Sequence, residues 1–279
     1  MPKRRNAVTL AAVVWFSAAQ AKAEPLPLWE AGAGAAILNL TDYRGSNERK
    51  TYVLPVPYLV YRGEVLQVDR QKVRGLLYSS EIAEFDFSVG GSVPVDSEDN
   101  QARRGMPDLD PTLELGPSLN FFLYRSPTRQ FNLDLRLPFR AVEATDFSGI
   151  HHQGWLFHPH LNIDLKGIVP GPGWNLGLLA GPLFGSRRYH EYFYGVAPQF
   201  ATAERAPFAA NGGYAGAQFI AALSKRFDNY WFGAFVKADT LEGAAFEDSP
   251  LVRKKNFLTG GFAFAWVFAK SGKLVDAKE

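Results

Sequence analysis

Two histidines have a spacing that could hold a metal ion. His158 and His160 are two residues apart, so in an extended strand their side chains fall on the same face. The sequence offers no identifiable third ligand, and two histidines on a polar face more often form a simple polar pair. The chain has no cysteine, which excludes disulfides, thiolate metal sites and a cysteine nucleophile. We therefore expect neither a metal site nor a cofactor.

A serine hydrolase is the second chemistry that the residue types allow. Asp146, Ser148 and His151 lie close together in one segment, and an acid, a serine and a histidine can form a catalytic triad. Closeness in a loop does not create that geometry, and no glycine-framed serine signature surrounds these residues. The chain also lacks a glycine-rich phosphate loop and a dinucleotide fingerprint. The sequence predicts that the protein is not an enzyme.

Charged residues recur at alternate positions of extended segments. In residues 131–140 the odd-numbered positions are all Phe or Leu, whereas most even-numbered positions are polar or charged. Alternate side chains of a strand point to opposite faces, so one face is apolar and the other carries charge. This pattern recurs along the chain. The charges that it assigns to one inner surface are Glu114, Asp134, Arg136, Arg140, Asp164, Lys237 and Asp239.

These alternating segments predict an all-β fold. Each is about the length that a tilted membrane strand requires, and together they predict a transmembrane antiparallel up-and-down β-barrel of about 12 strands. A soluble β-sandwich is the alternative. Pro55 and Pro57 predict a bulge or an irregular rim, because a central strand tolerates proline poorly. The expected strands cover residues 29–40, 52–61, 65–68, 73–78, 83–90, 113–123, 131–140, 155–165, 174–184, 215–224, 230–239 and 258–268.

The beginning of the chain is typical of an exported protein. A basic segment, a short apolar run and small residues up to Ala23 predict a signal peptide over residues 1–23. Its removal takes away four basic residues and no acidic one, so the formal net charge changes from +2 to −2. Such a balance gives no argument for nucleic-acid binding. We expect the barrel to cover residues 24–268 and a short C-terminal tail to cover residues 269–279.

The lengths of the connections predict the orientation in the membrane. Short and long links alternate along the chain, apart from a tight turn near Gln71, and bacterial outer-membrane barrels have short periplasmic turns and long outer loops. This predicts a location in the bacterial outer membrane, with outer-membrane lipid around the barrel and both termini in the periplasm.

Several loop and rim segments resemble the MipA/OmpV family of outer-membrane proteins, the family of the MltA-interacting protein. We interpret the shared residues as structural: Gly45, Gly195, Gly213 and Gly243 suit turns with positive φ, and the prolines make loops rigid. The tyrosines suit the membrane interface or a packed loop cap. The residues that carry the resemblance are Tyr43, Arg44, Gly45, Ser46, Gly105, Met106, Pro107, Tyr194, Gly195, Gly213, Tyr214, Gly243, Ser249 and Pro250.

The resemblance implies a structural or scaffold role that links murein hydrolase and synthase enzymes to the outer membrane. A narrow channel for small solutes is the alternative, and an outer-membrane hydrolase is a third. The inward charges are compatible with the first two roles, because they either line a pore or pair across the lumen and close it. We expect a mostly filled interior.

Overall fold

The computed structural model describes residues 26–62, 66–68, 73–75, 78–146 and 148–275. The expected signal peptide and the turn near Gln71 lie outside the described residues. The strands are β1 (Leu26–Pro27), β2 (Trp29–Thr41), β3 (Arg49–Arg62), β4 (Leu66–Val68), β5 (Val73–Gly75), β6 (Tyr78–Ser79), β7 (Ala83–Ser92), β8 (Thr112–Arg125), β9 (Phe131–Thr145), β10 (Ile150–Phe157), β11 (His160–Lys166), β12 (Trp174–Gly185), β13 (Gly213–Arg226), β14 (Tyr230–Thr240), β15 (Asn256–Lys270) and β16 (Leu274–Val275).

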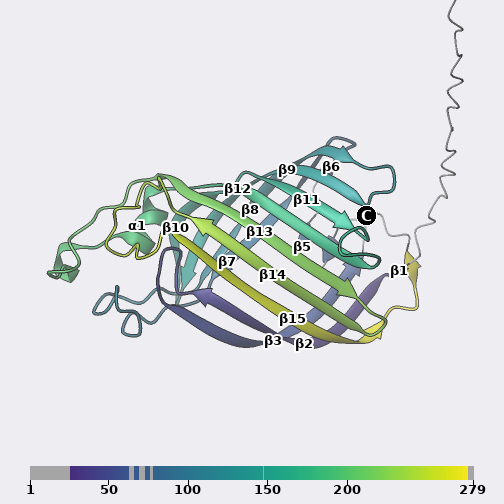
Figure 1. Ribbon diagram of the computed structural model, residues 1–279, viewed down its shortest axis with the longest axis horizontal. Coiled ribbons are helices and arrows are strands. Elements are labelled where there is room, and N and C mark those ends of the chain that lie inside the picture. The colour runs from purple at the N-terminus through teal and green to yellow at the C-terminus, as the bar shows by residue number, and fades with distance from the viewer. Residues whose placement is uncertain (1–25, 63–65, 69–72, 76–77, 147, 276–279) are drawn as a thin grey trace, which may run out of the picture.

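The expected barrel architecture of about 12 strands is confirmed (Figure 1). Fourteen strand segments form one sheet in which most neighbours in the sequence pair antiparallel, and the last long strand, β15, pairs with the first, β2. β10 and β11 both pair with β9 and with β12, so they are two halves of one wall strand. The break lies at His158 and Pro159, where sequence analysis predicted a continuous strand. A proline has no N–H for the ladder, which explains the interruption.

The expected bulge at Pro55 and Pro57 is wrong. β3 runs without interruption from Arg49 to Arg62 in a regular register with β2. Arg62 donates its N–H to Leu28, so the even-numbered residues of β3 bond to β2. The prolines are odd-numbered and direct their backbone to the opposite side, where their missing N–H groups break no bond to β2.

The alternation of side chains separates a lipid-facing surface from an inner surface. Large apolar residues at outward positions, such as Val236 and Phe262, are about half exposed, as expected for a wall that lipid covers. Inward positions carry buried polar groups such as Asp134, Asn162 and Asp239. No helix in the described part of the chain is long and apolar enough to cross a membrane.

Neighbouring positions on β14 provide a test of this assignment. Val236→Arg is expected to destabilise the folded barrel by about 2–4 kcal/mol, because it places a charge against the hydrocarbon core. Lys237→Arg, one residue further on, keeps an existing inward charge and is expected to change stability little. Urea unfolding in lipid vesicles measures both. Equal losses of stability for the two variants would contradict the inward and outward assignment.

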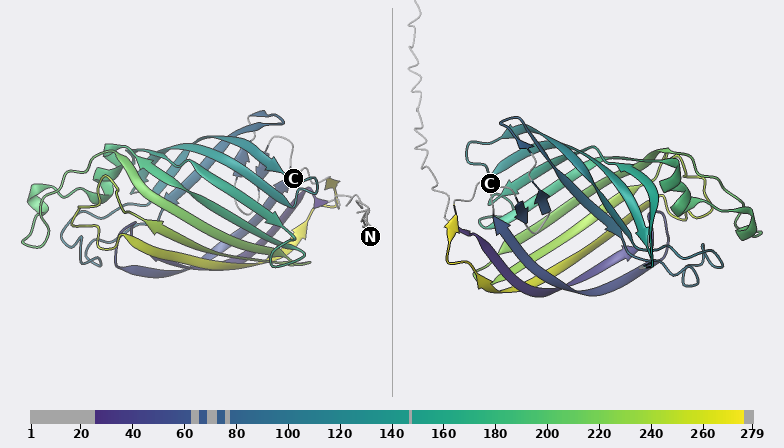
Figure 2. Two further views of the ribbon diagram at one scale, coloured as in Figure 1. Left: turned by 45° about the horizontal axis from the view of Figure 1, so that its top comes forward. Right: turned by 180° about the vertical axis from the view of Figure 1, so that it is seen from behind.

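The last described residues form a small sheet at one end of the barrel. β15 continues to Lys270, two residues past the expected end of the barrel. β16 then pairs antiparallel with β1, with Val275 opposite Leu26. Figure 2 places this small sheet at the end of the barrel opposite α1 (Arg187–Tyr194). Part of the expected tail therefore forms a strand pair with the start of the described chain.

Candidate functional site

The long loops at one end of the barrel form a packed cap (Figure 1). The cap contains the helix α1 and a short 3-10 helix, η1 (Pro198–Phe200). The buried apolar cluster at this end draws on four of the long connections and on the outer ends of several strands. Its members are Tyr43, Val95, Leu109, Val142, Leu156, Leu183, Tyr189, Phe193, Tyr194, Val196, Ala210, Ala215, Leu241, Ala244, Phe246, Leu251 and Phe257.

The helix α1 supplies the aromatic centre of the cap. Ser186 caps its N-terminus, with the hydroxyl oxygen accepting from the N–H of Tyr189 at 3.3 Å. The buried residues of α1 recur at helical spacing, so one face of the helix packs inward. The ring of Tyr194 stacks on that of Phe246 with 3.6 Å between centroids, and His190 meets the same phenylalanine at 4.6 Å.

Residues of the shared motifs hold three connections together. The Tyr43 hydroxyl donates to the carbonyl of Leu251 at 2.8 Å, and the Tyr194 hydroxyl donates to the carbonyl of Arg44 at 3.0 Å. The Ser249 hydroxyl donates to the carbonyl of Tyr194 at 2.8 Å. Each bond joins segments that are far apart in the sequence, so the motif residues form tertiary contacts inside the cap.

Other motif residues lie around this set of hydrogen bonds in the cap. Met106 packs against the apolar cluster, and the carbonyl of Pro107 accepts from Arg103. Tyr214 accepts a backbone bond from Ala245 and contacts the ring of Phe184 on the outer wall. Of the remaining motif positions, Gly105 and Gly243 lie on exposed turns, Gly213 is the exposed first residue of β13, and Pro250 is half-buried next to Ser249.

The motif glycines do not all serve the same purpose. Gly45 has a φ of +94°, and its carbonyl accepts from the N–H groups of Arg253 and Lys254, so positive φ is required there. The expectation of positive φ at Gly195 is wrong, because its φ is −68°. A Cβ at Gly195 would lie 2.6 Å from the backbone carbonyl oxygen of Glu191, so the space around this residue excludes a side chain.

Buried polar residues that the sequence pattern does not indicate also hold the cap together. The Asn100 side-chain amide donates to Asp42 at 2.7 Å and to the hydroxyl of Ser46 at 3.2 Å. Arg205 donates to the carbonyls of Ala102 and Arg104 at 2.9 and 3.0 Å. A polar loop residue carries no sequence signal that it will be buried, so these contacts follow only from the tertiary structure.

Below the cap, the charges of the inner surface form pairs. Arg44 reaches down from the first outer loop, and its Nε lies 2.9 Å from Asp239 Oδ1 on β14. Lys237 lies 3.5 Å from the other oxygen of the same carboxylate. On β9, Arg140 pairs with Glu114 at 2.9 Å. All seven predicted lumen charges are therefore in ion pairs, because Arg136 also contacts Asp134 at 3.1 Å and Asp164 at 3.6 Å.

A second charged cluster lies towards the other end of the lumen. Glu30 on β2 accepts from Arg226 at 3.1 Å and from Arg62 at 3.4 Å. The Tyr58 hydroxyl also donates to Glu30, and the Tyr58 ring packs against Trp231. These five side chains come from four strands and meet in the interior.

In the structure, the candidate metal ligands and the candidate serine triad are not arranged as a site. His158 and His160 are buried side by side. His160 Nδ1 donates to the carbonyl of His158 at 2.7 Å. Among the described residues, no group of three potential metal ligands is found. Ser148 donates to Asp146 at 2.8 Å in an exposed turn, and no hydrogen bond joins it to His151 within the described chain.

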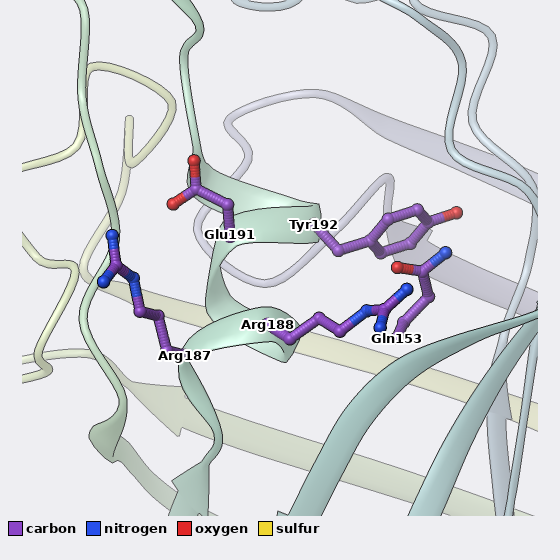
Figure 3. A pocket seen from close by; sticks show the side chains of 5 residues that line it. All are labelled: Gln153, Arg187, Arg188, Glu191 and Tyr192. Carbon is purple, nitrogen blue, oxygen red and sulfur yellow. The ribbon is translucent and has the colours of Figure 1, made fainter.

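The cap also carries a shallow depression of about 480 Å³ next to α1. Figure 3 shows Arg188 extending towards Gln153 and Tyr192, with Arg187 on the other side of the helix. Two of the lining residues are held by the cap itself: Glu191 accepts from the N–H of Ala210 at 2.7 Å, and Tyr192 donates to the carbonyl of Asp110 at 3.2 Å. The arginines are exposed.

Burial of His190 predicts that the cap depends on pH. Its Nδ1 lies 2.6 Å from the Asn211 carbonyl, and burial lowers the pKa of its side chain despite this bond. An unfolded histidine gains a proton near pH 6.5, so the stability that neutral His190 contributes is present above that pH and is lost as the pH falls below it.

We therefore expect the protection of cap amides from hydrogen exchange, after correction for the slower intrinsic exchange at lower pH, to fall between pH 8 and pH 5, and His190→Asn to weaken this pH dependence. The exposed His151 is the control, and His151→Asn is expected to leave the profile unchanged. A profile that His190→Asn does not alter would show that another group is responsible.

The chain matches a known protein family over most of its length. A protein-family model described as MltA-interacting protein MipA matches residues 31–268. No curated protein matches the chain.

The solved structures that are similar to this chain at low identity include the following three. A crystal structure of an outer membrane channel from Pseudomonas putida F1 is 12% identical, with 91% of this chain and 100% of that chain covered and a TM-score of 0.45. A structure named CymD monoaromatic hydrocarbon channel is 12% identical, with coverages of 89% and 68% and a TM-score of 0.28. The Pseudomonas putida toluene transporter TodX is 11% identical, with coverages of 87% and 68% and a TM-score of 0.27.

Proposed function

Because this chain belongs to the MltA-interacting protein MipA family, which points to the outer membrane of bacteria, we propose that it is a structural, scaffold protein of that membrane. In this role the barrel anchors the chain in lipid, and the periplasmic turns present a surface to murein hydrolase and synthase enzymes. The protein itself catalyses no reaction.

The observation that carries this proposal is the packed cap above paired lumen charges. A channel for hydrophilic solutes needs a continuous wet path. Here the Arg44–Asp239 pair ties the cap to the wall, and Arg140–Glu114 and Arg136–Asp164 use inward charges in cross-strand contacts. Charges that are paired in this way support a filled interior rather than an ion path.

One observation favours the alternative of a narrow channel. The buried Nε atoms of Arg136 and Arg140 and the Nε2 of His158 have no hydrogen-bond partner among the residues that the structure describes. Water molecules in the lumen would satisfy such groups. Planar-bilayer recordings distinguish the two functions: the scaffold is expected to give no steady open-channel current, and steady currents from pure protein would favour the channel.

The scaffold role is tested by photo-cross-linking in intact cells. Ile168, in a short turn at the periplasmic end, is an exposed apolar residue with 47% of its surface accessible. A photo-reactive residue at this position is expected to capture murein-remodelling enzymes. The same residue at Glu204, which is exposed in the outer cap, is the matched control and is expected to capture none. Absence of murein enzymes from the Ile168 products would contradict the scaffold role.

A further inference from the structure

The depression beside α1 presents two arginines that have no partner in the protein. It measures about 480 Å³, and Arg188 extends into it towards Gln153 and Tyr192, while Arg187 lies on the other side of the helix (Figure 3). Within the part of the chain that the structure describes, neither arginine side chain forms a hydrogen bond or an ion pair. A guanidinium group can only donate, so both side chains are available to an external oxygen acceptor.

The carboxylates on the neighbouring elements are already engaged. Glu191 on α1 accepts from the N–H of Ala210 at 2.7 Å, and Glu143 on β9 lies 2.7 Å from His152 on β10. These carboxylates form no ion pair with the two arginines. Arginine binds anionic oxygen groups through paired, charge-assisted hydrogen bonds. The depression therefore favours a ligand that carries a phosphate or a similar anionic group.

The first turn of α1 is fixed at the level of the membrane surface. The N–H of Ser186 donates to the carbonyl of Trp155 at 2.9 Å, and the N–H of Trp155 donates to the Ser186 hydroxyl at 3.0 Å. Trp155 is 45% exposed and stacks on the outward Phe139 with 5.2 Å between ring centroids. Outward tryptophans of membrane proteins lie at the level of the lipid head groups. Arg187 and Arg188 follow Ser186 directly, so they lie close to lipid phosphates.

A second depression, of about 740 Å³, lies in the lipid-facing wall across β12 to β15. Asp239 is buried inward, so its neighbour Ala238 points outward. The register places Ala238 opposite Phe219 and Leu258, which are about half exposed, and opposite residues share a face of the sheet. The outward residues that line this depression include Ala180, Pro182, Ala217, Phe219, Ala238 and Leu258. All six side chains are apolar, so the depression accepts hydrocarbon.

The two depressions are connected by β12. Pro182 precedes Arg187 by five residues, which is at most about 16 Å of extended chain. The hydrocarbon of one leaflet is about 15 Å thick, so a lipid whose head group meets the arginines extends its acyl chains to the level of the apolar depression. From β12 to β15 this depression crosses three strand intervals, about 14 Å in all, which is wider than a single acyl chain.

From these observations we infer that the outer end of the wall binds a phosphorylated lipid with more than two acyl chains from the outer leaflet. Its phosphate groups accept from Arg187 and Arg188, and its acyl chains fill the depression across β12 to β15. The positive charge above an apolar surface matches the negative head group and apolar chains of such a lipid. This binding is independent of the scaffold role, because it involves the outer end of the barrel rather than the periplasmic turns.

The head-group contact is tested with bisphosphoryl lipid A added to the full chain in detergent. Native mass spectrometry counts the lipids that remain bound, and the wild type is expected to retain one. Arg187→Gln with Arg188→Gln is expected to weaken binding by at least about tenfold, because the phosphate groups lose both guanidinium partners. Lys270→Gln with Lys273→Gln removes the same charge from exposed residues at the opposite end of the barrel, and it is expected to bind like the wild type.

Two outward alanines on β13 test the apolar depression. Ala217 lines it, whereas Ala221 lies on the same face of the strand outside it. Ala217→Trp is expected to weaken binding of the same lipid by at least about tenfold, because the indole occupies the space of an acyl chain. Ala221→Trp is expected to bind like the wild type. Heat-modifiable migration verifies that both variants are folded. The arginine variant changes only exposed side chains, so it tests the inference even if Ala217→Trp does not fold.

Three results with bisphosphoryl lipid A would overturn the inference: no retention by the wild type, equal weakening by the arginine and lysine variants, or equal binding by the two folded tryptophan variants. Two other lipids complete the test. Dephosphorylated lipid A is expected to bind at least about tenfold more weakly, and equal binding would show that the arginines do not recognise phosphate. Phosphatidylglycerol has one phosphate and two acyl chains, and equal binding of this lipid would show that the wall does not select a lipid with more chains.

Discussion

Replacing Arg44 by alanine is expected to loosen the cap and to destabilise the protein by about 3–5 kcal/mol, because it leaves a buried carboxylate without its main partner. The side chain of Asp239 is completely buried. Arg44 contacts it at 2.9 Å and also donates from Nη1 to the carbonyl of Ala215 at 2.8 Å. After the change, Lys237 at 3.5 Å and Gln218 at 3.2 Å are the remaining contacts of that carboxylate.

Thermal unfolding in detergent measures the loss of stability, and planar-bilayer recording detects a leak through the loosened outer end. Arg44→Lys is the control for charge, and it is expected to recover part of the stability because an ammonium group makes fewer directed bonds than a guanidinium. The double change Arg44→Ala with Asp239→Ala removes the stranded carboxylate and is expected to lose less stability than Arg44→Ala alone. A single variant as stable as the wild type would show that this pair does not hold the cap.

The second large effect is expected for Phe246→Ala in the core of the cap. Phe246 is completely buried, stacked on Tyr194 and in edge contact with His190. Truncation of a buried phenylalanine typically costs about 3–5 kcal/mol, through lost burial and the cavity left behind. We expect the cap to unfold locally while the strands remain paired, because this aromatic cluster belongs to the loops.

Limited trypsin digestion measures this effect, since the exposed Arg187 and Arg188 provide cleavage sites in α1. Cleavage there is expected to accelerate in Phe246→Ala and to change little in Phe246→Leu, which keeps most of the side-chain volume. Phe262→Ala, at a lipid-facing position, is the control for a phenylalanine outside the cap. Cleavage of Phe246→Ala at the wild-type rate would show that the cap does not depend on this contact.

The sequence by itself determined the barrel and the direction in which most strand residues point. Side chains alternate with period two, so a run such as 131–140 already assigns Leu135 to lipid and Arg136 to the interior. It also placed Glu114, Arg136, Arg140 and Asp164 on one inner surface. The structure pairs Arg140 with Glu114 and Arg136 with Asp164, because adjacent strands bring inward neighbours within reach. These inferences need only local periodicity and the order of strands along the chain.

Only the tertiary structure decided how the loops pack and how single residues fit into the strands and turns. The Tyr43–Leu251 bond spans 208 residues, and no periodicity connects two irregular segments that far apart. Pro55 and Pro57 predicted a bulge, yet they fit a regular strand because their backbone points away from β2. Gly195 predicted positive φ, whereas the nearby backbone carbonyl of Glu191 is what excludes a Cβ. In each case the deciding neighbour is distant along the chain or lies across a turn, so composition and spacing carry no signal for it.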